Sequence, residues 1–294
     1  MSLYWPAFEF TYTLDMRQLL PHLAAMESHN AARQSQLHPP QWRSRTLSQS
    51  EHAPLNDAFS QSARLREIQR RKEELVKNNS SHAQTWVRER FCSGSQPLAV
   101  DDILTMHRLV AEESGIRYDN VGVFRKDGQR VIVGETGIGV HTGAPARALP
   151  RLMTEYVQFV NSDSQTRLPA AIHALVAHFF FTTIHPFEDG SGRVGRLAAA
   201  ALMFQRGYRG HGFYALSNYF YENEHRYHSL IYETQQTPVF DLTRFVGFGL
   251  EGLVLELRGI NAFLKMKLNR AAERSILTPA LRRNAEARNR LGRN

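Results

Sequence analysis

The sequence predicts an all-α protein that carries one β-hairpin. Two observations carry this prediction. Apolar residues recur with the period of amphipathic helices along most of the chain, and only residues 121–143 combine short β-branched runs with a hairpin turn signal. A chain of 294 residues is also long enough to bury a sizeable core in one or two domains.

The apolar pattern places the helices in order along the chain. Residues 168–184 are apolar on most sides, so this helix is expected at the centre of the core. Residues 78–82, NNSSH, break the pattern and are expected to form a linker. The other helices are expected at residues 57–78, 99–114, 148–162, 193–204, 229–235 and 241–264.

The expected hairpin turns at Asp127-Gly128, a dipeptide that favours tight hairpin turns. The glycines that follow, Gly134, Gly137 and Gly139, also resemble a phosphate-binding loop. However, no Lys-Ser/Thr pair follows them and no helix is expected directly after the last glycine, as a P-loop requires. The sequence therefore favours a flexible loop here.

Composition limits the class of protein. The single cysteine, Cys92, excludes a disulfide framework and a cysteine-based zinc site within one chain. The first residues, MSLYWPAFEF, lack the pattern of a secretory signal. The longest apolar run, near residues 174–184, is too short to span a bilayer. These features predict a cytoplasmic protein with no membrane partner.

The positive charge is concentrated at the C-terminal end. Residues 258–294 hold ten Lys or Arg and two Asp or Glu, which accounts for the whole net charge of +8. Such a run is usually the solvated face of a helix, and the alternative is a patch for an acidic partner or nucleic acid. No aromatic residue follows Phe263, which argues against a stacking platform for single strands.

The stretch IHPFEDGSGRVGRLAAAALMF, residues 184–204, carries the strongest functional signal. Pro186 ends the buried helix and biases His185 away from the α conformation. Helical signals resume after Gly192, so the pattern predicts a helix, a tight loop and a second helix. Glycines in the loop let an anion approach the free amides at the start of that second helix.

The loop also supplies the groups that phosphoryl or nucleotidyl transfer requires. Arg193 and Arg196 share a helix face and can hold oxyanions with two donors each. Asp189 offers a hard oxygen ligand for Mg²⁺, and His185 can accept a proton near neutral pH. Phe187 is expected to hold the loop in shape with its ring in the core.

HPFEDGSGRVGR resembles the signature of the Fic family, H-P-F-x-[D/E]-G-N-G-R-x-x-R, and departs from it at Ser191, where the family has Asn. Residues around the motif, about 97–262, resemble the family as well. The family fold is an all-α helical bundle with a β-hairpin flap. The matching positions are His185, Pro186, Phe187, Asp189, Gly190, Gly192, Arg193 and Arg196.

The resemblance implies protein AMPylation, in which ATP and Mg²⁺ bind, a hydroxyl of a target protein attacks the α-phosphate, and pyrophosphate leaves. It implies that His185 is the base and that Asp189 holds Mg²⁺. It implies an anion hole at residues 190–192, namely Gly190, Ser191 and Gly192. Arg193 and Arg196 would hold the β- and γ-phosphates. The flap would bind the target main chain as an added strand.

Two further assignments follow from the resemblance. Asn223 and Tyr227 occupy positions that shape the adenine pocket in relatives. Glu51 falls on the glutamate of an inhibitory helix, but Leu47 and His52 replace the flanking residues of that motif. Glu51 is therefore expected either as an ordinary surface acid, with inhibition lost or moved to another chain, or as a weakened inhibitor.

The predicted organisation has three parts: an N-terminal helical region (1–80), a Fic core (81–270) and a basic C-terminal segment (271–294). Partners are expected to be ATP and a hydroxyl-bearing protein, with self-modification and a homodimer left open. Two alternatives remain: Doc-like phosphoryl or other nucleotidyl transfer on the same scaffold, and a catalytically weak relative that acts as a binding or regulatory protein. His173 and His178 are expected to be core histidines and not metal ligands.

Overall fold

The computed structural model describes most of the helical core and the loop that carries the motif. The described residues are 5–36, 82–92, 96–111, 120–127, 132–133, 141–208, 212–237, 239–262, 265–266 and 268–269. The helix expected at residues 57–78, Glu51 and the C-terminal segment from residue 270 lie outside this part.

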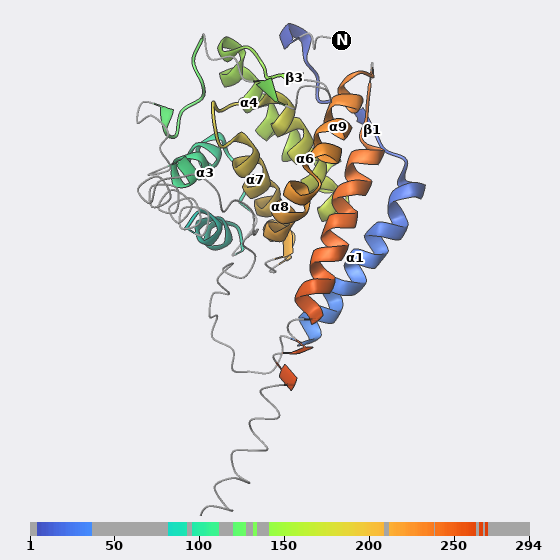
Figure 1. Cartoon of the computed structure of the whole chain (residues 1–294). Coiled ribbons are helices and arrows are strands. Elements are labelled where there is room, and N and C mark those ends of the chain that lie inside the picture. The colour runs from blue at the N-terminus through green and yellow to red at the C-terminus, as the bar shows by residue number, and fades with distance from the viewer. Residues whose placement is uncertain are drawn as a thin grey trace, which may run out of the picture.

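The described part is a bundle of helices with two small sheets of two strands each (Figure 1). Its α-helices are α1 (Met16–Gln36), α3 (Val100–Ala111), α4 (Leu149–Val160), α5 (Asp163–Thr166), α6 (Ala170–Ile184), α7 (Ser191–Gln205), α8 (Gly212–Glu222) and α9 (Glu224–Gln235). Residues 82–91 and 243–262 are also helical. The remaining elements are 3₁₀ turns η1 (Trp5–Ala7) and η3 (Ala146–Ala148), and strands β1 (Tyr12–Thr13), β2 (Ile132–Val133), β3 (His141–Thr142) and β4 (Phe240–Asp241).

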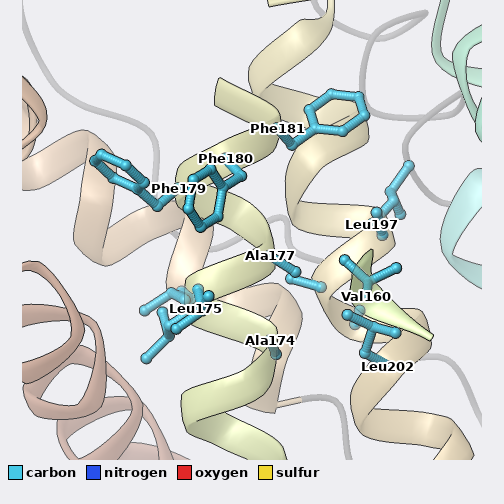
Figure 2. Packing of buried hydrophobic residues seen from close by; sticks show 14 of the residues in the cluster. Val160, Ala174, Leu175, Ala177, Phe179, Phe180, Phe181, Leu197 and Leu202 are labelled. Atoms are coloured by element: carbon cyan, nitrogen blue, oxygen red, sulfur yellow. The ribbon is translucent and has the colours of Figure 1, made fainter. Parts of the chain in front are cut away.

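Helix α6 is the centre of the core, as its composition predicts. Every residue of α6 is buried, because apolar side chains cover all its sides and other helices surround it. Phe179, Phe180 and Phe181 extend from it in different directions, while α7 lies beside it with Leu197 and Leu202 in the same cluster (Figure 2). The catalytic loop expected between α6 and α7 is therefore anchored at both ends in the core.

The helices expected at 99–114, 148–162, 193–204 and 229–235 are confirmed as α3, α4, α7 and α9, and residues 243–262 confirm the last predicted helix. Helix α4 illustrates the local cause: its buried residues recur at helical spacing, and Pro150 lies in its first turn, where no amide donor is needed. The expected linker residue His82 instead belongs to the helix at 82–91.

The N-terminal segment packs onto this core in a way that the periodicity does not indicate. Strand β1 pairs in parallel with β4, at the start of the helix at 243–262. The Phe10 ring lies against Phe159 and Phe180, with centroid distances of 5.0 and 5.2 Å. Helix α1 then runs alongside residues 243–262 (Figure 1), where Asn261 Nδ2 donates to the His29 carbonyl oxygen at 3.0 Å.

The hairpin expected at 121–143 is confirmed as an antiparallel pair but not in its turn. Strand β2 pairs with β3, so the connection runs through residues 134–140 and not through Asp127-Gly128. Residues 121–126 form no strand. The reason is long-range: the backbone N–H of Arg125 donates to the Pro186 carbonyl oxygen at 3.0 Å, which ties this stretch to the loop between α6 and α7.

None of the helices in the described ranges is both long enough and apolar enough to cross a membrane.

Candidate active site

The candidate site begins where α6 ends, at His185. This residue adopts φ 52° and ψ 66°, and among the described residues it is the one non-glycine residue with positive φ. Pro186 cannot continue the helix, and the predicted departure of His185 from the α conformation is confirmed as a left-handed turn. Such a conformation costs free energy, so it persists only where the surroundings hold it. Here the Arg125 Nε–H donates to the His185 carbonyl oxygen at 2.8 Å.

Phe187 holds the middle of the loop, as predicted. Its side chain is fully buried, and its ring stacks on the His107 imidazole with centroids 3.8 Å apart and planes 2° from parallel. The Phe124 ring lies nearby, with its centroid 5.7 Å away. The loop is therefore anchored in the core by the Phe187 ring, and its polar residues come before and after Phe187 in the sequence.

The loop turns into α7 at Gly190, which has φ 84°. This left-handed conformation suits glycine, because a side chain there is strained. Helix α7 then begins at Ser191, so the amides of its first turn have no partner within the helix. The predicted anion hole at Gly190, Ser191 and Gly192 thus lies at a helix N-terminus, where backbone N–H groups and the helix dipole favour an anion.

The Ser191 hydroxyl is engaged inside the loop. Its side chain is 1% exposed, and its Oγ both accepts from the Phe187 N–H at 3.0 Å and donates to the Phe187 carbonyl oxygen at 3.1 Å. The hydroxyl proton is therefore committed to Phe187. A phosphate at this position would be held by backbone amides and not by the Ser191 side chain.

We expect Ser191→Ala to lower the free energy of unfolding by about 1–3 kcal/mol, because it leaves the buried N–H and carbonyl of Phe187 without their partner. Urea denaturation of the ligand-free chain checks this. Ser162→Ala, which removes a partly buried hydroxyl from a turn far from the loop, is the control. A loss no larger than that of the control would contradict the structural role of Ser191.

Asp189 and Arg193, predicted to hold a metal and a phosphate, contact each other. Asp189 Oδ2 lies 3.2 Å from Arg193 Nη2, and Arg193 Nη1 donates to the Val110 carbonyl oxygen at 3.1 Å. The Asp189 side chain is 64% exposed and that of Arg193 is 22% exposed. The pair is open to solvent and therefore weak, so an incoming ligand can separate it.

The residues around Asp189 fit a Mg²⁺ ion that reaches the site with a nucleotide. No three His, Cys, Asp or Glu side chains gather as a metal site within the described ranges. Mg²⁺ often uses only one or two carboxylates together with substrate phosphates and water, so one exposed carboxylate beside a helix N-terminus is sufficient.

Arg196 differs from Arg193 in its surroundings. Burial lowers its pKa, while the neighbouring Tyr227 opposes that shift. A Cβ placed on Gly192 would lie 3.4 Å from Arg196 Nη1, so the guanidinium lies beside the predicted anion hole. In the described part of the chain no carboxylate forms an ion pair with Arg196. A partly buried cation without an acid favours an anionic ligand.

Tyr227 is buried beside Arg196. Its hydroxyl lies 3.1 Å from His178 Nε2 and 3.4 Å from Thr182 Oγ1, and burial raises its pKa. Its ring stacks on Phe220 at a centroid distance of 4.7 Å. Asn223, at the N-terminus of α9, donates from Nδ2 to the Tyr219 carbonyl oxygen at 2.9 Å. Both residues thus have structural contacts, and their adenine-binding role stays a prediction.

His173 and His178 are buried in α6, as expected of core histidines. Burial lowers the pKa of His173 to about 4 and that of His178 to about 3, and the charge of Arg196 acts in the same direction on His178. Both rings are therefore neutral near pH 7. His178 nevertheless borders the site, because it contacts Tyr227.

These depressed pKa values predict a loss of stability in weak acid. Unfolding returns each histidine to a pKa near 6.5, so the unfolded state binds more protons and stability falls as pH drops from about 6.5 towards 4. In that window each histidine lowers the free energy of unfolding by up to about 1.4 kcal/mol for each pH unit of acidification. Urea denaturation at pH 7 and 5.5 measures the fall, and His173→Leu should reduce it. Equal stability at both pH values would contradict the prediction.

Three residues that support the loop were not predicted. His107 lies on the buried face of α3, and Arg125 and Asn120 lie in the stretch before β2. Asn120 Nδ2 donates to Glu188 Oε2 at 2.6 Å, and His107 Nε2 lies 3.1 Å from the Asp189 carbonyl oxygen. The one signal in the sequence was a histidine on the apolar face of the predicted helix at 99–114.

Comparison with known proteins agrees with this geometry. The family model described as the Fic/DOC family matches residues 97–203, which contain α3, the β2–β3 pair, α4, α6, the loop and most of α7. Proteins named protein adenylyltransferase Fic from Drosophila melanogaster and Drosophila sechellia are 30% identical over 111 residues. The match covers 38% of this chain and 21% of theirs, so the chain spans about a fifth of the length of these relatives.

Two solved structures share the fold. A Fic family protein from Desulfovibrio desulfuricans G20 matches with a TM-score of 0.58 and 17% identity, covering 87% of this chain and 77% of that one. A Fic-domain signaling protein from Bacteroides thetaiotaomicron matches with a TM-score of 0.51 and 23% identity, covering 66% and 73%. The predicted Fic-type helical fold is confirmed, and residues 97–203 of the chain match the Fic/DOC family.

Proposed function

We propose that this chain is a protein adenylyltransferase that transfers AMP from ATP to a hydroxyl group of a protein and releases pyrophosphate. The observation that carries the proposal is the arrangement at one helix N-terminus. His185 is held in a left-handed turn at one end of the loop, and Arg196 lies at the other end without a carboxylate partner in the described part of the chain. The names of the curated relatives support this choice of reaction.

The proposed reaction exchanges one bond to phosphorus for another. The hydroxyl oxygen of the target attacks the α-phosphorus, the bond to the bridging oxygen between the α- and β-phosphorus breaks, and pyrophosphate leaves with those electrons. His185 accepts the hydroxyl proton. The amides of residues 190–192 stabilise charge on the α-phosphate, while Arg193 and Arg196 bind the β- and γ-phosphates.

Asp189 would hold Mg²⁺, which neutralises charge on the phosphates when it is bound. The pair between Asp189 and Arg193 must then separate, so that the carboxylate turns to the metal and the guanidinium turns to a phosphate. The anion hole consists of backbone, since the Ser191 hydroxyl is occupied by Phe187. Ser191, which stands where the family has Asn, therefore changes the side chain that bonds to the Phe187 backbone. The backbone N–H groups that would bind the phosphate are the same with either residue.

The β2–β3 pair is proposed to receive the target as an added strand, through main-chain hydrogen bonds that depend little on the target's sequence. The adenine would lie towards Tyr227 and Asn223. An inhibitory contact between Glu51 and Arg196 stays a prediction, because Glu51 lies outside the described residues.

The test uses ATP labelled at the α- or the γ-phosphate, with Mg²⁺, the full chain and a mixture of candidate protein substrates. Protein that retains only the α-label supports AMP transfer. Protein that retains only the γ-label would overturn the proposal in favour of phosphoryl transfer. Absence of both labels, on the chain itself and on every protein offered, would overturn it in favour of a binding role. The His185→Ala variant provides the background.

A further inference from the structure

The stretch at residues 120–125 supports the loop between α6 and α7 along its length. Arg125 donates from its backbone N–H to the Pro186 carbonyl oxygen at 3.0 Å and from Nε to the His185 carbonyl oxygen at 2.8 Å. Asn120 donates to the Glu188 carboxylate at 2.6 Å. These bonds reach the first half of the loop and Glu188, but none of them reaches Asp189.

Asp189 is connected to the same stretch through His107. On one side, the Gly122 N–H donates to His107 Nδ1 at 3.0 Å. On the other side, His107 Nε2 lies 3.1 Å from the Asp189 carbonyl oxygen. The ring is buried and stacks on Phe187 over its full face, so it has one orientation in which both nitrogens meet their partners.

These two contacts define the protonation of the ring independently. A backbone N–H can only donate, so Nδ1 must accept with a free lone pair. A carbonyl oxygen can only accept, so Nε2 must carry the proton. Both contacts therefore require the neutral tautomer with hydrogen on Nε2, and neither permits the other neutral tautomer.

We propose that His107 is a positioning residue for the metal carboxylate: in its Nε2–H tautomer it holds the Asp189 backbone, and thereby the Gly190 turn, in the conformation that binds Mg²⁺ and nucleotide. The link to Mg²⁺ rests on the proposed function, whereas the tautomer does not. The Asp189 carbonyl is fixed by the ring, and the next peptide turns through φ 84° at Gly190. The carboxylate itself stays 64% exposed; its Oδ1 accepts from the Gly190 N–H at 2.6 Å and its Oδ2 lies 3.2 Å from Arg193 Nη2.

The first measurement concerns the chain without any ligand. Two-bond ¹⁵N–¹H correlation spectra of the histidine rings at pH 7 distinguish the two neutral tautomers, and His107→Gln identifies the signal of His107. The expected result is a protonated Nε2 and an unprotonated Nδ1. Hydrogen on Nδ1, or on both nitrogens, would overturn the proposal whether or not the chain transfers AMP.

The second measurement separates positioning from packing with three variants. His107→Phe keeps a ring against Phe187 and loses both hydrogen bonds. His107→Gln places an amide N–H near the position of Nε2 and can reach the Asp189 carbonyl. His107→Asn places an acceptor near the position of Nδ1 for Gly122 and is too short to reach Asp189.

The readout is the Mg²⁺ concentration at half-maximal binding of a fluorescent ATP analogue, which requires no turnover. Because supporting residues behind metal ligands typically change affinity by about 10–100-fold, the Phe and Asn variants should raise this midpoint about tenfold or more, while the Gln variant restores it to near the wild-type value. A midpoint unchanged in all three variants, or restored by Asn and not by Gln, would overturn the positioning role. A wild-type chain that binds no nucleotide would instead contradict the proposed function and leave the tautomer to be judged by its spectrum.

Discussion

His185→Ala is expected to lower AMP transfer by about 10²-fold or more, since removal of a general base typically has an effect of this size. ATP binding should stay close to the wild-type value, because the phosphates are proposed to contact the amides of α7 and the two arginines and not His185. The loop should also keep its shape, since Arg125 bonds to the carbonyl of residue 185 and not to its side chain.

His185→Asn is the matched variant, because Asn adopts the left-handed conformation more readily than other non-glycine residues and cannot act as the base. Both variants should therefore bind the nucleotide and transfer almost no AMP. Single-turnover assays together with nucleotide titration measure the two properties separately. Transfer within a few-fold of wild type in either variant would contradict the assignment of His185.

Arg196→Met is expected to weaken ATP binding strongly and to leave the fold as stable as before or more stable. A hydrogen bond to a charged group contributes about 1.5–3 kcal/mol, so loss of the bidentate guanidinium should lower nucleotide affinity by about 10–10²-fold. The same guanidinium is partly buried and has no ion-pair partner among the described residues, so an apolar side chain of similar length removes a desolvation cost.

Arg193→Met is the control for this prediction. Arg193 is also proposed to bind phosphate, but it already contacts Asp189 and the Val110 carbonyl oxygen. Its replacement should weaken ATP binding without raising the melting temperature. A fall in melting temperature on Arg196→Met would contradict the account and would indicate a carboxylate outside the described residues, with Glu51 the first candidate.

The parts of the fold that local chemistry determines were predicted from the sequence. The helix α6 follows from a run of apolar residues, its end follows from Pro186, and the start of α7 follows from the glycines after Asp189. Placement of Phe187 in the core also followed, since a large ring in a polar loop requires burial. These features depend on neighbours within a few residues.

The parts that depend on distant residues were not predicted. The turn signal Asp127-Gly128 is local, yet residues 121–126 bond to a loop about 60 positions away through Arg125. The pairing of β1 with β4 joins residues still further apart. Ser191 was expected in the anion hole, but the sequence did not indicate that its hydroxyl bonds to the Phe187 backbone, because that orientation depends on the shape of the whole loop.

The same limit applies to His107. On the sequence it is one histidine on the apolar face of a helix, a position typical of a core residue. Its two hydrogen-bond partners lie 15 and 82 residues away in the chain, and no local spacing indicates that they meet at one ring.

The central claim, transfer of AMP and not of phosphate, is tested most directly by the intact mass of the protein after incubation with ATP and Mg²⁺. The wild-type chain, or a protein substrate offered to it, should gain the mass of one adenosine monophosphate group, and the His185→Ala variant should leave both unchanged. A gain equal to one phosphate group, or an AMP gain of equal size with the His185→Ala variant, would contradict the account.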